Sequence, residues 1–250
     1  MVKGIVVTER DTRLLYDCYL HAILSIQQIR ERHYPQCAKC TLLNRLTKLT
    51  HEGLLAKHRV GIVLHLGKSQ NIGNVYQITT KGIKLLKATY PNDPFRDEPV
   101  RLNSHSLAHD LLLTDALSAL QRRFPGYKLV PSCVRKNAAE PQEKIPDAVA
   151  LDANERPIIA IELELSGKSA VRYRDIVLQY KVHSNVDAVL YIVGGRGIRD
   201  KIEFQITQQR ATGGRRFSTG KFFFCTLKDL LENPMGVSIS NGETQLKGEP

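Results

Sequence analysis

Three acidic side chains stand close together near the middle of the sequence, on two apolar stretches that a short polar turn separates. Asp147 lies near the start of the first stretch, and Glu162 and Glu164 alternate with apolar residues in the second. Alternate residues of a strand point to the same face, so the two glutamates share one face of the predicted strand. If the stretches pair antiparallel across the turn 153–156, Asp147 reaches the same end of the hairpin as the glutamates.

Carboxylates gathered in this way repel one another unless a cation lies between them. Hard oxygen ligands suit Mg²⁺ or Mn²⁺, which activate water and stabilise the leaving oxygen of a phosphodiester. Asp147, Glu162 and Glu164 are therefore predicted to bind a divalent metal ion, and Lys168 to hold the attacking water or offset charge on the phosphorane. An alternative stays open here, because the same alternation is typical of a half-buried strand whose glutamates face solvent.

The elements predicted around these residues are those of a mixed sheet flanked by helices. Apolar periodicity predicts helices over 104–123, 170–184, 198–210 and 227–232, and strands over 127–134, 145–152, 157–165, 188–193 and 222–226. A strand, a helix and a returning strand form a crossover unit, so part of this sheet is expected to be parallel.

The first ninety residues predict a different arrangement. Helices are expected over 9–23, 26–33 and 38–52, then short strands over 54–58, 61–66 and 74–78, a loop over 67–73 and a helix over 83–90. Three helices followed by a β-hairpin is the winged-helix order. The fold class is thus α+β or mixed α/β, with a winged helix followed by a mixed sheet flanked by helices.

In a winged helix the third helix lays its polar side in the major groove of DNA while the wing contacts the backbone. The predicted DNA-binding residues are Lys39, Asn44, Arg45 and Lys48 on that helix, with Lys57 and Arg59 on the wing. Lysine and arginine neutralise phosphates, whereas Asn44 or Arg45 could read base edges. Winged helices also serve as protein-interaction modules, and exposed basic residues often form only a solvated face.

The overall charge favours a polyanionic partner. Lys plus Arg total 36 against 25 Asp plus Glu, a formal net charge of +11, and nucleic acid is the commonest partner of such an excess. A basic protein whose charge only confers solubility is the alternative. No basic amphipathic helix with a bulky aromatic face supports an anionic membrane surface. No apolar run approaches the roughly 20 residues that span a bilayer, and no secretory signal is recognised, so a cytoplasmic protein without membrane insertion is expected.

Five cysteines, an odd number, argue against a disulfide framework. Cys37 and Cys40 form a lone CxxC with His33 nearby, and a zinc site would need a further ligand such as His51 or His58. The sequence favours buried helix cysteines over a metal site.

A proline-punctuated polar stretch over 91–99 reads as a linker. The predicted domains are a winged helix over 1–92 and a second domain over 100–235, followed by a loose tail over 236–250.

Three segments carry a resemblance to a known family. The opening 8–35 (TERDTRLLYDCYLHAILSIQQIRERHYP), the helix 105–117 (HSLAHDLLLTDAL) and the stretch 146–169 (PDAVALD…IAIELELSGKS) together resemble the plasmid replication-relaxation family, and within it the MobC-type mobilisation proteins, which are relaxases. The resemblance covers roughly residues 8 to 195. It implies a winged helix fused to a domain of the PD-(D/E)xK restriction-endonuclease type.

Carried over to this sequence, the resemblance makes Asp147 the motif aspartate and Glu162 the motif acidic residue. Glu164 then departs from the pattern, because many such nucleases have lysine there; either Glu164 substitutes or Lys168 supplies the cation. His109 and Asp115 match helix positions from which a further group joins the site. Less directly, the resemblance places substrate-orienting groups at Gln179 and Tyr180.

The function implied is Mg²⁺- or Mn²⁺-dependent nicking of double-stranded plasmid DNA at a transfer origin. The implied partners are an accessory mobilisation protein and a coupling protein, and the chain could form a homodimer. Covalent cleavage by Tyr173 or Tyr180 stays open. The alternative is a non-enzymatic winged-helix origin-binding or regulatory protein with a degenerate nuclease fold, which Glu164 in the usual lysine position favours.

Overall fold

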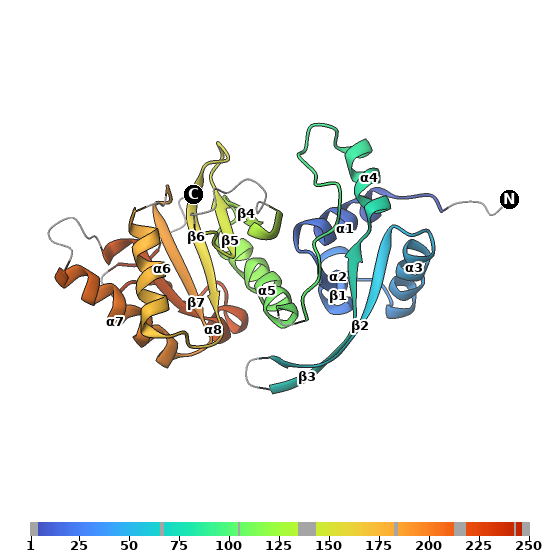
Figure 1. Cartoon of the computed structure of the whole chain (residues 1–250). Coiled ribbons are helices and arrows are strands. Elements are labelled where there is room, and N and C mark those ends of the chain that lie inside the picture. Colours follow the sequence, from blue (N-terminus) through green and yellow to red (C-terminus); the bar gives the residue numbers. More distant parts are fainter. Residues whose placement is uncertain are drawn as a thin grey trace. The chain divides into compact units, whose positions relative to one another are not determined.

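The structure is a computed structural model of the whole chain. It describes residues 5–65, 68–104, 106–134, 144–182, 185–212, 219–242 and 244–246. The chain divides into two compact units, Met1–Thr114 and Asp115–Pro250 (Figure 1). No helix within these described ranges is long and apolar enough to cross a membrane.

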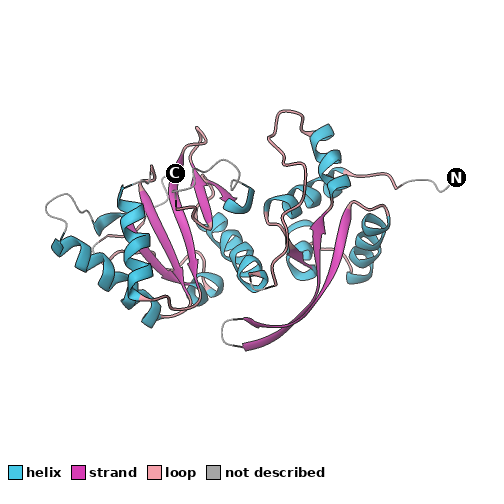
Figure 2. Cartoon of the chain, in the orientation of Figure 1, coloured by secondary structure: helices cyan, strands magenta, loops and turns pink. Residues whose placement is uncertain are grey.

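The first unit has the winged-helix order. Its elements are α1 (Glu9–Leu20), β1 (Leu24–Ser25), α2 (Ile26–His33), α3 (Lys39–His51), β2 (Leu55–His65), β3 (Lys68–Ile78), α4 (Thr80–Thr89) and the first half of α5 (Leu107–Arg123). The strands form an antiparallel three-stranded sheet in the order β1-β3-β2. The long β2–β3 hairpin is the wing (Figure 2).

Side-chain caps set where these helices begin. Thr8 and Asp11 form a reciprocal capping box at the start of α1, and Ser25 and Gln28 form another at the start of α2. Thr79 caps α4, which therefore begins three residues earlier than the sequence pattern predicts.

The wing is longer than expected, because the predicted loop over 67–73 is largely strand. Pairing continues from Val60 opposite Gly73 to Ile62 opposite Asn71, and onward to the ends of both strands. Gly73 has a φ of +74°, a backbone conformation that glycine adopts without strain. A glycine of this kind bends a strand without ending it. Composition alone does not distinguish such a bent strand from a loop.

The predicted linker packs against the first unit. Phe95 makes edge-to-face contacts with Tyr16 and Tyr19, at centroid distances of 5.8 and 5.0 Å, and the backbone N–H of Arg96 donates to the Tyr19 hydroxyl at 2.9 Å. Gln77 Nε2 also donates to the carbonyl of Val100 at 2.6 Å. Aromatic packing and these hydrogen bonds hold the proline-rich segment, although its composition is that of a linker.

The division between the units falls inside α5 instead of in the proline-rich segment. Leu111 of α5 packs in a buried cluster with Ile23 and Val75, and its carbonyl accepts from Gln28 Nε2 at 2.9 Å. The first half of α5 is thus held by the winged helix, which moves the boundary beyond residue 100.

A buried histidine also joins α5 to the helices of the first unit. His21 Nε2 lies 3.3 Å from Arg32 Nη2 and His21 Nδ1 lies 3.2 Å from the Thr114 hydroxyl, which donates to the Asp110 carbonyl. Arginine has no acceptor atom, so Nε2 accepts and Nδ1 carries the proton. The geometry therefore requires neutral His21, and burial together with the Arg32 charge lowers its pKa to about 4.

Acid is expected to destabilise the first unit through His21. Its folded pKa lies below the ordinary value of 6.5, so the unfolded chain binds the proton more tightly and stability falls as pH drops from 6.5 to 4. The loss is about 3 kcal/mol, since one pKa unit corresponds to about 1.4 kcal/mol. Hydrogen exchange of α1 amides across this range measures it.

The matched variant is His21→Gln, which cannot titrate. Its stability should vary much less between pH 6.5 and 4, whatever its stability at neutral pH. An equally steep pH dependence in the variant would assign the effect to other groups.

The second unit contains a mixed five-stranded sheet in the order β4-β5-β6-β7-β8. Its elements are β4 (Lys128–Pro131), β5 (Ala148–Leu151), β6 (Pro157–Glu164), α6 (Ala170–Val182), β7 (Ala188–Val193), α7 (Arg196–Thr212), β8 (Phe222–Thr226) and α8 (Leu227–Glu232), with short 3-10 turns at Ser132–Val134 and Thr219–Lys221. Strands β4, β5 and β6 pair antiparallel, whereas β6, β7 and β8 are parallel. The predicted hairpin and the predicted crossover are both confirmed.

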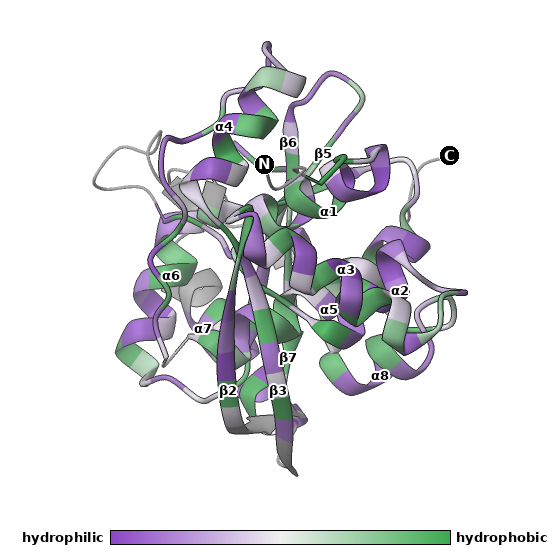
Figure 3. Cartoon of the chain, turned by 90° about the vertical axis from the view of Figure 1, so that its right-hand side faces the viewer, coloured by the Kyte–Doolittle hydropathy of each residue, from purple (hydrophilic) through white to green (hydrophobic). Residues whose placement is uncertain are grey.

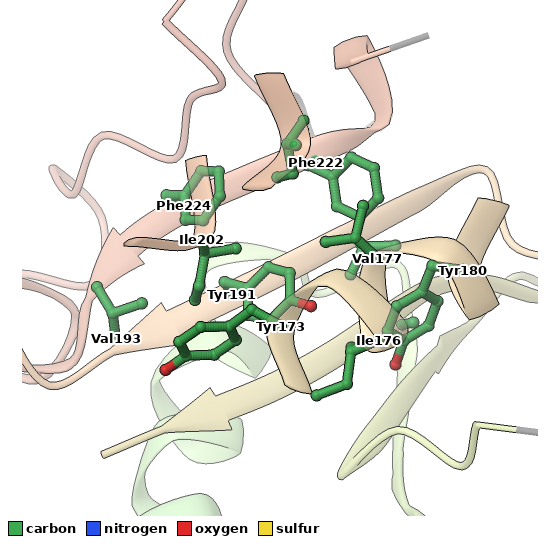
Figure 4. Packing of buried hydrophobic residues seen from close by; sticks show 12 residues of the cluster. Tyr173, Ile176, Val177, Tyr180, Tyr191, Val193, Ile202, Phe222 and Phe224 are labelled. Carbon is green, nitrogen blue, oxygen red and sulfur yellow. The ribbon is translucent and has the colours of Figure 1, made fainter. Parts of the chain in front are cut away.

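Helices α6 and α7 cover one face of this sheet (Figure 1). Ala160 of β6 belongs to the core beneath them, together with Tyr173, Val177, Tyr191 and Phe222 (Figure 4). Since Glu162 and Glu164 follow Ala160 at alternate positions, the same helices lie over the two glutamates.

Part of the predicted loose tail is packed. Val237 and Ile239 are buried, and Ser240 exchanges backbone hydrogen bonds with Phe224 of β8. Alternating apolar residues after α8 thus extend the ordered second unit beyond residue 235.

Candidate functional site

The carboxylates predicted to act together lie on the β5–β6 hairpin. Ala148 pairs with Ile161, so the next step of this register places Asp147 opposite Glu162. The backbone N–H of Leu163 donates to Asp147 Oδ2 at 2.8 Å, which holds the aspartate against β6. Asp147 and Glu162 therefore meet at one end of the hairpin, in a register that a β-bulge at Ala150–Leu151 shifts by one residue from the pairing beside the turn.

Both glutamates are buried. Glu162 is 8% exposed and Glu164 is 6% exposed, because α6 covers their face of the sheet. The alternative in which these glutamates face solvent is therefore wrong. Burying two carboxylates costs free energy unless cations and hydrogen bonds compensate them.

Two lysines provide that compensation. Lys144 Nζ lies 2.7 Å from Glu162 Oε1, and Lys168 Nζ donates to Glu164 Oε2. The mutual repulsion expected of the carboxylates is thus relieved by ammonium groups of the chain itself. Sequence reasoning missed Lys144; its only signal is its position three residues before Asp147.

Three tyrosines, which Figure 4 labels, complete the surroundings of the two glutamates and their lysines. The Tyr180 hydroxyl donates to Glu162 Oε1, and the Tyr173 hydroxyl accepts from the backbone N–H of Lys168 at 3.0 Å. Tyr191 pairs in register with Glu162 from the adjacent strand. Its buried hydroxyl has no hydrogen-bond partner among the residues that the structure describes.

The electrostatics follow from burial. Burial raises the pKa of Glu162; the Lys144 charge opposes this shift and the Asp147 charge adds to it. Burial and the Glu162 charge raise the pKa of Tyr180 far above its ordinary value. Tyr180 is therefore a protonated donor to Glu162, and covalent cleavage by this residue stays a prediction.

The predicted set of three metal ligands does not assemble as such. Within the described ranges, no group of three or more His, Cys, Asp or Glu side chains is placed to hold a metal ion. Asp147 and Glu162 face each other across the hairpin, but Glu162 is paired with Lys144 and Glu164 with Lys168. Magnesium commonly binds through one or two protein carboxylates, with waters and substrate phosphates completing its shell, and its binding at Asp147 and Glu162 stays a prediction.

The remaining predicted site residues lie on helices α5 and α6. His109 lies in the first unit, with Nδ1 3.6 Å from Asp110 Oδ1, and Asp115 is the first residue of the second unit. Gln179 lies on α6 beside Tyr180. Their predicted roles stay predictions.

A second candidate surface lies on the winged helix. Helix α3 buries Leu42, Leu46 and Leu49 and turns its polar side outward, as its purple and green stripes show (Figure 3). The exposed residues of that side are Lys39, Cys40, Thr41, Asn44, Thr47, Lys48 and His51. Lys57 and Arg59 are exposed on β2 of the wing. Five of the six predicted DNA-binding residues are therefore accessible.

Arg45 is the exception. Its Nε donates to Asp11 Oδ1 at 2.8 Å, its Nη2 bonds to Asp11 Oδ2, and Nη2 also donates to the Val6 carbonyl at 2.8 Å. Asp11 is fully buried, and the Arg45 hydrogen bonds hold the pKa of its carboxyl below the ordinary value against the opposing effect of burial. Arg45 compensates a buried carboxylate, so reading a base would require breaking this pair.

The CxxC cysteines differ from expectation. Cys40 is exposed on α3 and Cys37 is half-buried before it, with Sγ 3.8 Å from Arg10 Nη1. The prediction of buried helix cysteines is wrong, because Cys40 lies on the exposed side of α3 and Cys37 precedes the helix.

Comparison with known proteins adds little. No protein-family model and no curated protein matches this chain. A solved structure of a protein with a GntR superfamily winged-helix-turn-helix domain from Halomicrobium mukohataei is 17% identical and aligns over 40% of this chain and 85% of that chain, with a TM-score of 0.29. That likeness is too low to carry an argument. The winged-helix assignment rests on element order and strand pairing, and the resemblance to the plasmid replication-relaxation family stays a prediction.

Proposed function

We propose that this chain is a DNA-binding protein whose winged helix lays the polar side of α3 in the major groove of duplex DNA. The observation that carries the proposal is this exposed side, which presents Lys39, Asn44 and Lys48 and whose fully exposed residues include no large apolar side chain. Lys57 and Arg59 on β2 extend the cationic surface along the wing. The formal net charge of +11 supports a polyanionic partner.

Removing two phosphate contacts tests this proposal. The variant Lys48→Ala/Lys57→Ala is expected to bind a random-sequence duplex more weakly, and the slope of log K against log salt should fall by about 1.8, since each phosphate contact contributes about 0.9. Fluorescence anisotropy over a salt series measures both. The matched control is Lys84→Ala, which removes an exposed lysine from α4. Equal loss in the control, or no loss in the double variant, would contradict α3 and wing binding.

Asn44 supplies a test of sequence reading. On the best duplex recovered from a random library, Asn44→Ala is expected to cost about 1–3 kcal/mol of discrimination at one base pair. Binding to random duplex should change little, because an asparagine neutralises no phosphate.

We further propose that the second unit cleaves phosphodiester bonds at the Asp147–Glu162 pair. The supporting observation is that these carboxylates meet at the carboxyl end of β6, beside the carboxyl ends of the parallel strands β7 and β8, the edge at which open α/β sheets bind ligands. The resemblance to PD-(D/E)xK nucleases supplies the reaction class of this proposal.

In this proposal Asp147 and Glu162 hold Mg²⁺ or Mn²⁺, which would supply an activated water and stabilise the leaving oxygen. Lys144 and Lys168 lie beside the carboxylates and would offset charge on the phosphorane. Tyr180 orients Glu162 through its hydroxyl. Nicking at a plasmid transfer origin, with an accessory mobilisation protein and a coupling protein, is what the resemblance adds to this proposal.

A further inference from the structure

A group of cationic side chains surrounds the loop Gly167–Ser169, which joins β6 to α6. Lys168 lies in the loop, Arg172 lies on the first turn of α6, and Lys201 reaches over from α7; all three are exposed. Lys201 Nζ lies 3.4 Å from the position that a Cβ atom on Gly167 would occupy. The chain thus brings charges from two separate segments, 168–172 and α7, to one corner of the second unit.

These charges are only partly compensated. Lys168 pairs with Glu164, but neither Arg172 nor Lys201 forms an ion pair with a carboxylate in the part of the chain that the structure describes. Other arginines of the same helices are paired: Arg174 with Asp175, and Arg199 with Glu203. Two unpaired cations beside a third raise the local positive potential, so an anion is favoured there.

The corner also adjoins Asp147, Glu162 and Glu164, which we call the carboxylate centre. Lys168 belongs to the corner and also contacts the carboxylate centre. Its ammonium group bonds to Glu164, and its backbone N–H donates to the Tyr173 hydroxyl of α6. Partial burial and the charges of Lys144 and Arg172 lower the pKa of Lys168, against the opposing charges of Glu162 and Asp147. Arg172 is therefore close enough to act electrostatically on Lys168.

We propose that Lys168, Arg172 and Lys201 form a phosphate-binding corner that holds the backbone of a DNA strand beside the Asp147–Glu162 pair. The inference rests on the proposed function, because it assigns to the second unit a contact with the same DNA that the winged helix binds. The carboxylates repel the phosphates of a DNA backbone. Exposed cations beside the Asp147–Glu162 pair are therefore needed to bring a strand close to it.

The test uses the full chain and a short fluorescein-labelled single strand of random sequence. The variant Arg172→Gln/Lys201→Gln leaves the carboxylate centre intact. It is expected to bind the strand roughly tenfold more weakly near 0.1 M salt, with a salt slope lower by about 1.4, since a single-strand phosphate contributes about 0.7. The matched control is Arg174→Gln, on the same helix two residues from Arg172, which should bind like the unmodified chain.

The winged-helix variant Lys48→Ala/Lys57→Ala separates this inference from the proposed function. Weaker strand binding by the Arg172/Lys201 variant, in the presence or absence of the winged-helix substitutions, supports the corner even if those substitutions leave duplex binding unchanged. Unaltered strand binding and slope in the Arg172/Lys201 variant overturn the corner, and winged-helix binding then stands or falls on its own measurement. Equal loss in Arg174→Gln also overturns it, because the effect would then reflect total charge.

Discussion

Replacing Asp147 with asparagine is expected to reduce Mg²⁺- or Mn²⁺-dependent nicking of supercoiled plasmid DNA about a hundredfold or more. Mutating a residue that hydrogen-bonds to a metal ligand typically lowers metal affinity or activity about 10- to 100-fold. Mutating a ligand itself should lower activity at least as much. The fold should survive, because the asparagine oxygen can still accept the Leu163 N–H that Asp147 Oδ2 accepts at 2.8 Å. Conversion of supercoiled to open-circular DNA on a gel measures the rate.

The matched control for this prediction is Glu155→Gln. Glu155 is an exposed carboxylate at the turn of the same hairpin, paired with Lys128 and away from the Asp147–Glu162 end. It should nick at the unmodified rate. If Asp147→Asn nicks as fast as the control, Asp147 has no part in cleavage. If the unmodified chain does not nick with either ion, the nuclease proposal fails and the DNA-binding proposal is unaffected.

Removing Lys144 is expected to destabilise the second unit by about 2–3 kcal/mol. Lys144→Ala leaves Glu162 buried beside Asp147 without its cation, and breaking a buried pair costs about 3–5 kcal/mol. The value is reduced here because the Lys144 side chain is 19% exposed. Hydrogen exchange of β6 amides reports this opening free energy for the second unit by itself.

A double variant and a pH series identify the cause. Lys144→Ala/Glu162→Gln removes both charges, so it should recover much of the loss. The deficit of Lys144→Ala should also shrink as pH falls, because the raised pKa of Glu162 rises further without Lys144. The folded chain then takes up a proton more readily than the unfolded chain, which stabilises it at acidic pH.

The control is Lys128→Ala, which removes the lysine of the exposed pair with Glu155 and should leave β6 exchange unchanged. A deficit in Lys144→Ala that is independent of pH, or that persists undiminished in the double variant, would show that Lys144 stabilises the unit by packing instead of by its charge.

Several features were predictable because they depend on neighbours in the sequence. The capping box of Thr8 and Asp11 spans three residues, and the short turn between β5 and β6 predicts the antiparallel hairpin. The alternation of Glu162 and Glu164 correctly predicts that they share a face. Local hydrogen bonds and strand geometry decide all of these.

Other features depend on contacts between distant residues. Arg45 has a residue type and position typical of a DNA-binding helix, but Asp11, 34 residues away, holds its guanidinium. The stretch around Phe95 has a linker composition, yet Tyr16 and Tyr19 give it an aromatic surface on which to pack. Periodicity describes one element at a time and is blind to such partners.

By itself, the sequence determined a basic chain, a winged helix, a mixed sheet and a hairpin that places carboxylates at one end. Only the tertiary structure decided that α6 buries those glutamates, that Lys144 and Lys168 neutralise them, and that α5 belongs to both units. The physical reason is that backbone geometry and turns act over a few residues. The environment of a charge, in contrast, is set by whichever distant side chains the packed fold brings against it.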